Sequence, residues 1–378
     1  MASIVKRSTS RGLRYDVRYR LATGQVRTKT FQNQRDAKTY AATVDADRAR
    51  GTLLDPRAGR VTLDAYVSDW IESNVDLRPR TVDQYRSVHR LHIAPVLGRV
   101  DLAQIDAASV RAWHAGLVRS GVGAATVAKA YRFLRAVLNT AVEDGRILAN
   151  PCQIKRAGVE RAEERPVATP AEVLALANAV ASERRCMVLL AGFCGLRLGE
   201  VLGLANRHVD LLHGTVTVER QLQEIGRNGA QMFSEPKTAK GRRTVPLPGT
   251  VATALRFHLE NHSAGGGPDG LLFTGAKGGP LRRAVWNTEW ATARAAVGLG
   301  SLRYHDLRHS ALTLLAASGA TIAELQAHAG HASPAAAMRY QHATHDRAQV
   351  LAELVQRAIA SDVEAAEAGS TLTQLAMS

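Results

Sequence analysis

Six residues in the second half of the chain are of the types that catalyse phosphoryl transfer. They are two arginines, a lysine, two histidines and a tyrosine, namely Arg197, Lys237, His305, Arg308, His331 and Tyr340. A guanidinium group binds two phosphate oxygens at once, and a phenol can attack phosphorus. Lysine and histidine can donate and accept the protons that such a step moves. The set therefore predicts an enzyme that breaks and rejoins a phosphodiester through a covalent intermediate.

Three short strings hold five of these six residues. Gly195-Leu196-Arg197 contains the first arginine, and His305-Asp306-Leu307-Arg308-His309 contains one histidine and the second arginine. Gly330-His331 precedes Tyr340, which lies nine positions after the histidine. These strings closely resemble the motifs of the tyrosine recombinases, and the layout of the whole chain resembles that of a phage-type integrase.

The resemblance implies a role for each reactive group. Tyr340 is expected to attack the scissile phosphate, which leaves a 3′-phosphotyrosyl link and a free 5′-hydroxyl. His305 is expected to act as the general base, and Lys237 to protonate the leaving 5′-oxygen. His331 is expected to support the phosphate by hydrogen bonding. Because the pKa of tyrosine is ordinarily ~10, the phenol needs a base or a strong positive field at neutral pH.

The resemblance also implies that the two arginines neutralise the nonbridging phosphate oxygens. Arg197 and Arg308 match the arginines of the family's motifs, and Glu200 matches a carboxylate that positions the first of them. Taken alone, an arginine with a glutamate three residues later indicates a surface ion pair. The glycines on either side of Arg197 are expected to allow the backbone to approach a ligand closely.

The lysine has a close alternative. Pro236-Lys237-Thr238, followed by Gly241-Arg242-Arg243, resembles the hairpin that carries the family's catalytic lysine. Lys240 lies three residues further on and is the alternative to Lys237.

A zinc site is the competing interpretation of the second motif. His305 and His309 are four residues apart, a spacing at which two histidines on one helical face can bind zinc. The glutamate of the HExxH motif is missing, and Arg308 on the same face would repel a cation. No metal and no cofactor are expected, because a covalent intermediate conserves the energy of the phosphodiester and no GxxxxGK[ST] string occurs.

Charge separates the N-terminal part from the rest of the chain. The protein has 378 residues and a net charge of +15, and residues 1–60 alone contain fourteen Lys and Arg against five Asp. A length of this size favours two or three domains. A basic module concentrated in this way favours a nucleic-acid partner over a generally basic surface.

Residues 1–55 are predicted to form a small β-sheet packed on one helix. Apolar residues alternate with charged ones over 13–21, Thr23-Gly24 indicates a turn, and 26–31 reads as the return strand. Asn33 is expected to cap a helix that ends near Gly51. The module resembles the arm-type DNA-binding domain of integrases. Its candidate DNA contacts are Arg14, Arg18, Arg20, Arg27 and Lys29.

Residues 62–150 are predicted to be entirely helical. Helices are expected to begin at Thr62 and at Thr81, and further helices are expected over 107–119 and 124–144. This segment resembles the helical core-binding domain of the family. Its candidate phosphate contacts are Arg78, Arg80, Arg86, Arg90, Lys129 and Arg132.

Residues 165–360 are predicted to form a mainly helical catalytic domain with one strand-rich interruption. Thr169 and Thr321 each begin a helix, and 214–218 and 243–247 read as strands around a basic turn. An amphipathic helix is expected over 350–359, and the resemblance implies that it docks on a neighbouring protomer. Residues 361–378 are expected to be a mobile tail. The fold class is therefore multidomain and mainly α, with small β-sheets.

Partners and location follow from the same features. The resemblance implies double-stranded DNA attachment sites with core and arm sequences, a homotetramer on DNA, a host DNA-bending protein and an excisionase. No stretch of about 18 apolar residues and no signal peptide occur, so no membrane contact is expected. Three cysteines without a CxxC pair fit a reduced, cytoplasmic location in a bacterial host.

Two other functions are compatible with parts of the sequence. A Xer-type resolvase or a topoisomerase-like nicking and closing enzyme would use the same chemistry, but simple resolvases usually lack a basic N-terminal module. A non-catalytic DNA-binding regulator would not need the complete set of six catalytic residues.

Overall fold

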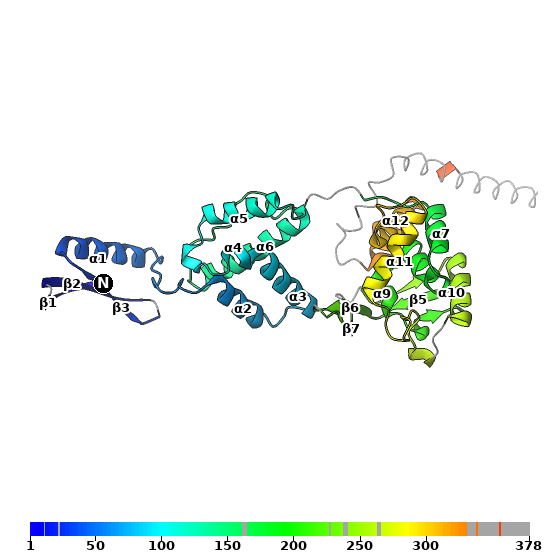
Figure 1. Cartoon of the computed structure of the whole chain (residues 1–378), viewed down its shortest axis with the longest axis horizontal. Helices are drawn as coiled ribbons and strands as arrows, with labels where there is room; N and C mark the ends of the chain where they lie inside the picture. The colour runs from blue at the N-terminus through cyan, green and yellow to red at the C-terminus, as the bar shows by residue number, and fades with distance from the viewer. Residues whose placement is uncertain are drawn as a thin grey trace, which may run out of the picture. The chain divides into compact units, whose positions relative to one another are not determined.

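A computed structural model describes residues 1–10, 12–21, 23–160, 165–226, 228–236, 241–262, 266–330, 338 and 355–356. The chain divides into two compact units, Met1–Glu163 and Glu164–Ser378, each of which is described by itself. Both units are mainly helical, with small antiparallel sheets, as the sequence predicts (Figure 1).

The first unit begins with a three-stranded antiparallel sheet covered by one helix. The strands are β1 (Ser3–Thr9), β2 (Gly12–Arg20) and β3 (Val26–Phe31), in the order β1-β2-β3, and the helix is α1 (Gln34–Ala49). Val17, Tyr19 and Val44 are buried between the sheet and α1. Asn33 caps α1 by accepting a hydrogen bond of 2.8 Å from the backbone N–H of Asp36, which confirms the predicted helix start.

Strand β1 was not predicted. Residues Ser3–Ser8 of this strand are exposed, and the last residue, Thr9, is half-buried. The strand lies at the edge of the sheet. A strand with both faces near solvent shows no alternation of apolar and polar residues, so the sequence pattern carries no signal for it.

The rest of the first unit is helical, as predicted. Its elements are α2 (Leu63–Ser73), α3 (Pro79–Val88), a π-helical turn (His89–Ile93), α4 (Ala94–Leu97), a 3₁₀ turn (Leu102–Gln104), α5 (Ala107–Arg119) and α6 (Ala124–Glu143). A separate core, with Trp113, Tyr131 and Phe133 among its largest buried side chains, holds these helices together. The start predicted at Thr81 is wrong by two residues, because Pro79 occupies the first helical position.

The second unit is built around α8. Its helices are α7 (Pro170–Ala179), α8 (Arg185–Gly192), α9 (Leu198–Gly203), α10 (Gly249–Asn261), α11 (Arg283–Ala296), α12 (Tyr304–Ala317) and α13 (Ile322–Ala329). Short 3₁₀ turns cover Ser182–Arg184, Asn206–His208 and Gly267–Asp269. All residues of α8 from Cys186 to Gly192 are buried, and α7, α10 and α12 each pack against this helix. The helix starts predicted at Thr169 and Thr321 are confirmed, and each has a capping box.

The strand-rich interruption contains more than the two strands that were predicted. Strand β5 (Thr215–Val218) pairs with β8 (Arg243–Pro246) and with the short β4 (Val209–Asp210). Between β5 and β8 lies a separate hairpin of β6 (Gln221–Ile225) and β7 (Ala230–Ser234), where the sequence predicted only a basic turn. The strands of this hairpin carry several polar and half-buried residues, so their pattern resembles that of a loop.

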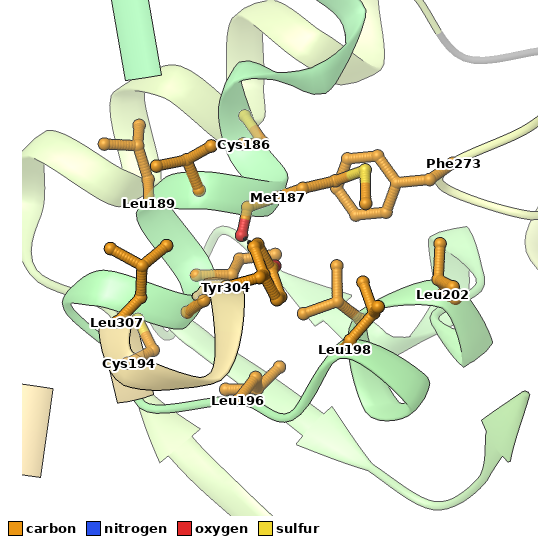
Figure 2. Close-up of a cluster of buried hydrophobic side chains, with 14 of the residues drawn as sticks. Cys186, Met187, Leu189, Cys194, Leu196, Leu198, Leu202, Phe273, Tyr304 and Leu307 are labelled. Carbon is orange, nitrogen blue, oxygen red and sulfur yellow. Dashed lines mark hydrogen bonds between the residues drawn. The ribbon is translucent and has the colours of Figure 1, made fainter. Parts of the chain in front are cut away.

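Tyr304 and Leu307 fix α12 to the core of the second unit (Figure 2). The hydroxyl of the buried Tyr304 donates a hydrogen bond of 2.6 Å to the backbone carbonyl of Met187 in α8. Its ring also lies edge-on to Trp286 and Trp290 of α11. With these residues facing the core, the orientation of α12 about its axis is set, and this determines where Arg308 points.

Several predictions lie outside the described residues. They concern Lys237, Lys240, His331, Tyr340, most of the amphipathic helix over 350–359 and the tail over 361–378. Across the described ranges, no helix combines the length and the apolar character that crossing a membrane requires.

Candidate functional site

Arg197 stands at the N-terminal end of α9, where its backbone is extended. Its backbone N–H and its guanidinium both bind the carboxylate of Glu200, at 2.9 Å to Oε2 and 2.7 Å to Oε1. The Arg197 side chain is 36% exposed, whereas that of Glu200 is 4% exposed. Arg197 therefore reaches the surface from a position fixed by a buried carboxylate.

Glu200 is shared by two arginines. Arg243 of β8 donates from Nη2 and Nη1 to Oε2 and Oε1 of Glu200, at 2.9 and 3.2 Å. Burial raises the pKa of Glu200, but the hydrogen bonds and charge of Arg243, joined by the charge of Arg197, outweigh it and lower the pKa to about 2. The carboxylate is therefore ionised at neutral pH and holds both guanidinium groups.

Arg308 of α12 is buried and binds two backbone carbonyls. Nη1 donates to the oxygen of Gly195 at 2.5 Å, and Nη2 donates to the oxygen of Ala329 at 2.6 Å. The first bond joins Arg308 to the turn that leads into Arg197, and the second joins it to the end of α13. The two predicted arginines are thus connected through a few covalent bonds and one hydrogen bond.

Two arginines together hold the C-terminal end of α13. Arg243 donates from Nε to the carbonyl of His328 at 2.8 Å, next to the carbonyl of Ala329 that Arg308 binds. The last carbonyls of a helix have no partner within the helix and carry partial negative charge, so cationic donors stabilise them. Gly330 follows in the left-handed conformation, with φ +61° and ψ +42°, and ends the helix.

His305 lies one turn before Arg308 on α12 and is exposed. Desolvation by the surrounding protein, followed by the positive charges of Arg308 and Arg197, lowers the pKa of His305 below its ordinary value. The imidazole is therefore neutral at pH 7 and can accept a proton. His305 and Arg308 are three residues apart on α12, so they lie toward the same face of that helix.

The sequence predicted that the two glycines near Arg197, Gly195 and Gly199, allow the backbone to approach a ligand closely. The structure shows a different reason for Gly199. A Cβ atom on Gly199 would lie 2.9 Å from the carbonyl oxygen of Leu222, so this glycine allows α9 to pack against β6 and not against a ligand. Gly195 has a φ of +67°, which only glycine adopts without strain, and its carbonyl is the acceptor for Arg308.

Lys237, His331 and Tyr340 lie outside the described residues, but two of their sequence neighbours are held by the arginines above. Arg243 donates from Nη1 to the carbonyl of Gly241 at 3.2 Å, four residues after Lys237. Gly330, the residue before His331, follows the carbonyl that Arg308 binds. The roles of these three residues stay predictions.

Arg243 and His328 were not among the predicted site residues. Nε2 of His328 donates to the carbonyl of Cys194 at 3.1 Å, and desolvation followed by the charges of Arg243 and Arg308 lowers the pKa of His328. Strand alternation held a signal for Arg243, because it lies two residues before the buried Val245 and hence on the same inward face. For His328 no comparable signal exists in the sequence.

The five basic residues predicted to contact DNA in the N-terminal sheet divide between its two faces. Arg14, Arg18 and Arg20 alternate with the buried residues of β2 and so lie on the face away from α1. Arg27 and Lys29 pair in register with Tyr19 and Val17, on the face toward α1. Arg27 is bound there to Asp55, and the Lys29 ammonium lies 4.4 Å from the centre of the Tyr40 ring.

The basic residues predicted in the helical segment of the first unit are mostly exposed. Arg78, Arg80, Arg86 and Arg90 are exposed, and Lys129 is half-buried. Arg132 is exposed and donates to the carbonyl of Gly158 at 2.7 Å and to Glu160 at 2.6 Å. A phosphate bound by Arg132 would have to compete with this carboxylate.

The arginine cluster does not lie in the cavity of about 780 Å³ in the same unit. That cavity is lined by residues of the 3₁₀ turn Ser182–Arg184, of α10 and α11 and of the loop between these helices, among them Arg184, His258 and Glu289, and by none of the predicted site residues. In the described part of the chain, no three His, Cys, Asp or Glu side chains are grouped so that they could hold a metal ion. Of the cluster, Arg197 and His305 reach the surface, whereas Arg308 and Arg243 are buried.

Comparison with protein families gives two matches. Residues 167–347 match the phage integrase family, and residues 62–118 match the N-terminal SAM-like domain of phage integrases. The first range contains all six predicted catalytic residues, and the second lies within the predicted helical domain.

Integrases and related recombinases are also similar along most of the chain. An integrase of Mycobacterium phage L5 is 32% identical over 87% of this chain and 90% of its own length. A tyrosine recombinase XerC of Rhodospirillum centenum is 32% identical over 72% of this chain and 80% of its own length.

Two solved structures show the same fold. The integrase of transposon Tn1549, in complex with a circular-intermediate DNA, has a TM-score of 0.68 at 21% identity and covers 78% of this chain and 99% of its own. A λ integrase tetramer bound to a Holliday junction has a TM-score of 0.55 at 20% identity and covers 87% of this chain and 96% of its own.

Proposed function

This chain belongs to the phage integrase family and is a DNA recombinase, and we propose that it carries out its reaction through Tyr340 at the cluster of Arg197, Arg308 and His305. It is a site-specific tyrosine recombinase that integrates and excises a phage or a related mobile element. The observation that carries the proposed site is the linked pair of arginines beside a neutral imidazole. Such a site can bind a phosphodiester and accept a proton in the same place.

Strand cleavage begins with attack of the Tyr340 oxygen on the scissile phosphorus. The bond from phosphorus to the 5′-oxygen breaks as the bond to the tyrosine oxygen forms, which leaves a 3′-phosphotyrosyl link. His305 takes the proton of the phenol, and Lys237 gives a proton to the leaving 5′-oxygen. Attack by the 5′-hydroxyl of another strand reverses each step and rejoins the DNA. The complete reaction needs no oxidant and no nucleotide, and it hydrolyses no bond overall.

Arg197 and Arg308 stabilise the negative charge that grows on the nonbridging oxygens. Each donor aimed at that charge contributes roughly 3–4 kcal/mol to lowering the barrier, by analogy with other oxyanion sites. His331 donates a further hydrogen bond to the phosphate. Glu200 keeps Arg197 in place and does not itself exchange a proton, since its pKa of about 2 leaves it ionised.

The remaining parts of the chain supply recognition of DNA. Residues 1–55 bind arm sites through the open face of the sheet, which is the face away from α1 that contains Arg14, Arg18 and Arg20. Residues 62–150 bind the core site, and residues 165–360 catalyse strand cleavage and joining. The active assembly is a tetramer on DNA in the cytoplasm of a bacterial host, assisted by a DNA-bending protein and an excisionase. The λ integrase tetramer on a Holliday junction supports this assembly by analogy.

A Xer-type resolvase is the nearest alternative, and the extent of the similarity argues against it. The phage L5 integrase is similar over 87% of this chain, whereas the XerC relative is similar over 72%. The chain also contains the basic sheet β1-β2-β3, which a simple resolvase does not need for core-site binding. A non-catalytic regulator is the second alternative. A cleavage assay distinguishes it from a recombinase, because a regulator would bind DNA without cleaving it.

Covalent trapping tests the proposal. The full chain is incubated, with EDTA present, with nicked duplexes prepared from the DNA beside its gene. Any adduct is digested with nuclease, and the modified residue is identified by mass spectrometry. A metal-independent adduct on Tyr340 is expected. DNA binding without any adduct, also after addition of a host extract, would support the regulator instead.

A further inference from the structure

Arg243 contacts three separate segments of the proposed active site. It binds both carboxylate oxygens of Glu200, the carbonyl of Gly241 and the carbonyl of His328. Glu200 holds Arg197, Gly241 ends the segment that contains Lys237, and His328 lies three residues before His331. One side chain thus touches a neighbour of three of the six proposed catalytic residues.

We propose that Arg243 is a positioning residue that sets Arg197, Gly241 and the end of α13 relative to one another. The proposal rests on the proposed function, because it concerns the same six catalytic residues. The Arg243 side chain is only 6% exposed, and its Nε, Nη1 and Nη2 all donate to acceptors of the protein itself, so it acts through its neighbours. Its position on β8, which pairs with the buried strand β5, fixes the point from which the guanidinium reaches all three segments.

The geometry requires an arginine. A guanidinium is planar and carries five N–H donors in fixed directions, and here Nε serves one acceptor while Nη1 and Nη2 serve the others. A lysine ammonium at this position can pair with the Glu200 carboxylate but cannot reach carbonyls on two other segments at the same time. Arg243→Lys therefore keeps the charge of the site and loses its geometry.

Glu200 reports whether Arg243 acts on the active site. Arg243 and Arg197 are the charged groups that face this buried carboxylate, the first from β8 and the second from the start of its own helix. Without Arg243, burial raises the pKa of Glu200 and only Arg197 opposes it. Protonation of Glu200 then releases Arg197, so cleavage becomes sensitive to acid in a range where the wild type is not.

The test compares single-turnover cleavage from pH 5 to pH 9 for the full-length wild type, Arg243→Gln, Arg243→Lys and a matched control, Arg242→Gln. The substrate is the nicked duplex that gives the wild-type adduct. Arg242 is the residue just before Arg243 and is 67% exposed, and its ion pair with Glu219 is long, at 3.8 Å. The control thus removes the same charge from the neighbouring position without touching Glu200.

We expect Arg243→Gln to cleave about 100-fold more slowly than Arg242→Gln at pH 7.5, as displaced catalytic groups do, with unchanged DNA affinity. The cleavage rate of Arg243→Gln should also fall further at acid pH, where Glu200 gains a proton. Adding Glu200→Gln to Arg243→Gln should remove this additional fall. Arg243→Lys should lose some thermal stability with its hydrogen bonds to the two carbonyls, but remain folded at the assay temperature and still cleave slowly, which separates positioning from a folding defect.

Two outcomes overturn the inference. One is cleavage by Arg243→Gln at the rate of the Arg242→Gln control. The other is full activity of Arg243→Lys, which would reduce the role of Arg243 to its charge. Failure of the proposed function looks different, since the wild type itself would then form no adduct on Tyr340.

Discussion

The guanidinium of Arg308 donates a hydrogen bond to the carbonyl of Gly195, which lies 113 residues earlier in the chain, at an N···O distance of 2.5 Å. The carbonyl points toward α12 because Gly195 has a φ of +67°. Arg197 follows two residues later and begins α9. The turn at Gly195 therefore determines both where Arg308 is anchored and where Arg197 starts.

We expect Gly195→Ala to weaken the protein and to slow DNA cleavage. The new Cβ would meet Ala311 and His328 at 3.8 Å, an ordinary contact, so the cost comes from the left-handed backbone. That cost is about 1–2 kcal/mol of unfolding free energy. If the turn relaxes instead, the carbonyl leaves Arg308. Denaturant unfolding and single-turnover cleavage measure the two effects.

Gly214→Ala is the matched control, because Gly214 has a φ of +60° and no atom within 4 Å of the Cβ position. It should lose a similar amount of stability and keep its cleavage rate. Equal cleavage by the two variants would show that the turn at Gly195 matters only for folding.

The rate of cleavage should depend on the protonation of His305. Desolvation and the charges of Arg308 and Arg197 lower the pKa of His305 from its ordinary value of 6.5, so the neutral base persists at pH 7. The rate should be level above pH 6.5 and fall only on the acid side, as the imidazole gains a proton. His305→Gln should cleave slowly and lack this acid limb.

His328→Gln is the control for His305→Gln, because the pKa of His328 is also lowered. His328 donates to the carbonyl of Cys194 and is not proposed to accept a proton from Tyr340. Its variant should retain the acid limb. An acid limb that persists in His305→Gln would assign the base to another group.

Two tyrosine variants should have opposite effects. Tyr340→Phe should abolish the covalent adduct and leave DNA binding nearly intact, since it removes only the attacking oxygen. Tyr304→Phe should form the adduct and lose about 1 kcal/mol of stability, because it removes one buried hydrogen bond, to Met187. Burial raises the pKa of Tyr304, which keeps that phenol protonated. An adduct that still forms with Tyr340→Phe would eliminate Tyr340 as the nucleophile.

The sequence predicted those features that depend on local pattern. Asn33, Thr169 and Thr321 cap helices as expected, because a side-chain cap is a contact between neighbours in the chain. The motif around Arg308 was expected to be helical and is part of α12. The alternation in β2 correctly separated the buried Val17 and Tyr19 from the arginines between them.

The features that were missed depend on contacts far apart in the chain. Arg243 binds a carbonyl 85 residues away at His328 and a carboxylate 43 residues away at Glu200. Alternation with the buried Val245 indicates that Arg243 faces inward, but no local pattern indicates which distant groups it binds. Gly199 was interpreted as a ligand contact for the same reason, since only the folded chain places the Leu222 carbonyl against it.

The open face of the N-terminal sheet should supply the affinity for arm sites. We expect Arg14→Gln/Arg18→Gln to weaken arm-site binding and to leave core-site binding unchanged. Both arginines lie on the face away from α1, where each can bind a DNA phosphate. The slope of log K against log salt concentration should therefore decrease by roughly 2. Footprinting and salt titration on DNA beside the gene measure both effects.

Arm sites are defined in this experiment as the footprints that the full chain gives and residues 56–378 do not. Arg50→Gln is the control, because Arg50 is 71% exposed at the end of α1, where its guanidinium forms a 3.7 Å ion pair with Asp47. It removes one charge from the same module without altering the open face. The loss of arm-site affinity per removed charge is compared between Arg50→Gln and the double variant. An equal loss per charge would indicate that the net charge of the module, and not its open face, attracts the DNA. If residues 56–378 give every footprint that the full chain gives, with equal affinity, the assignment of the sheet to arm-site binding is refuted.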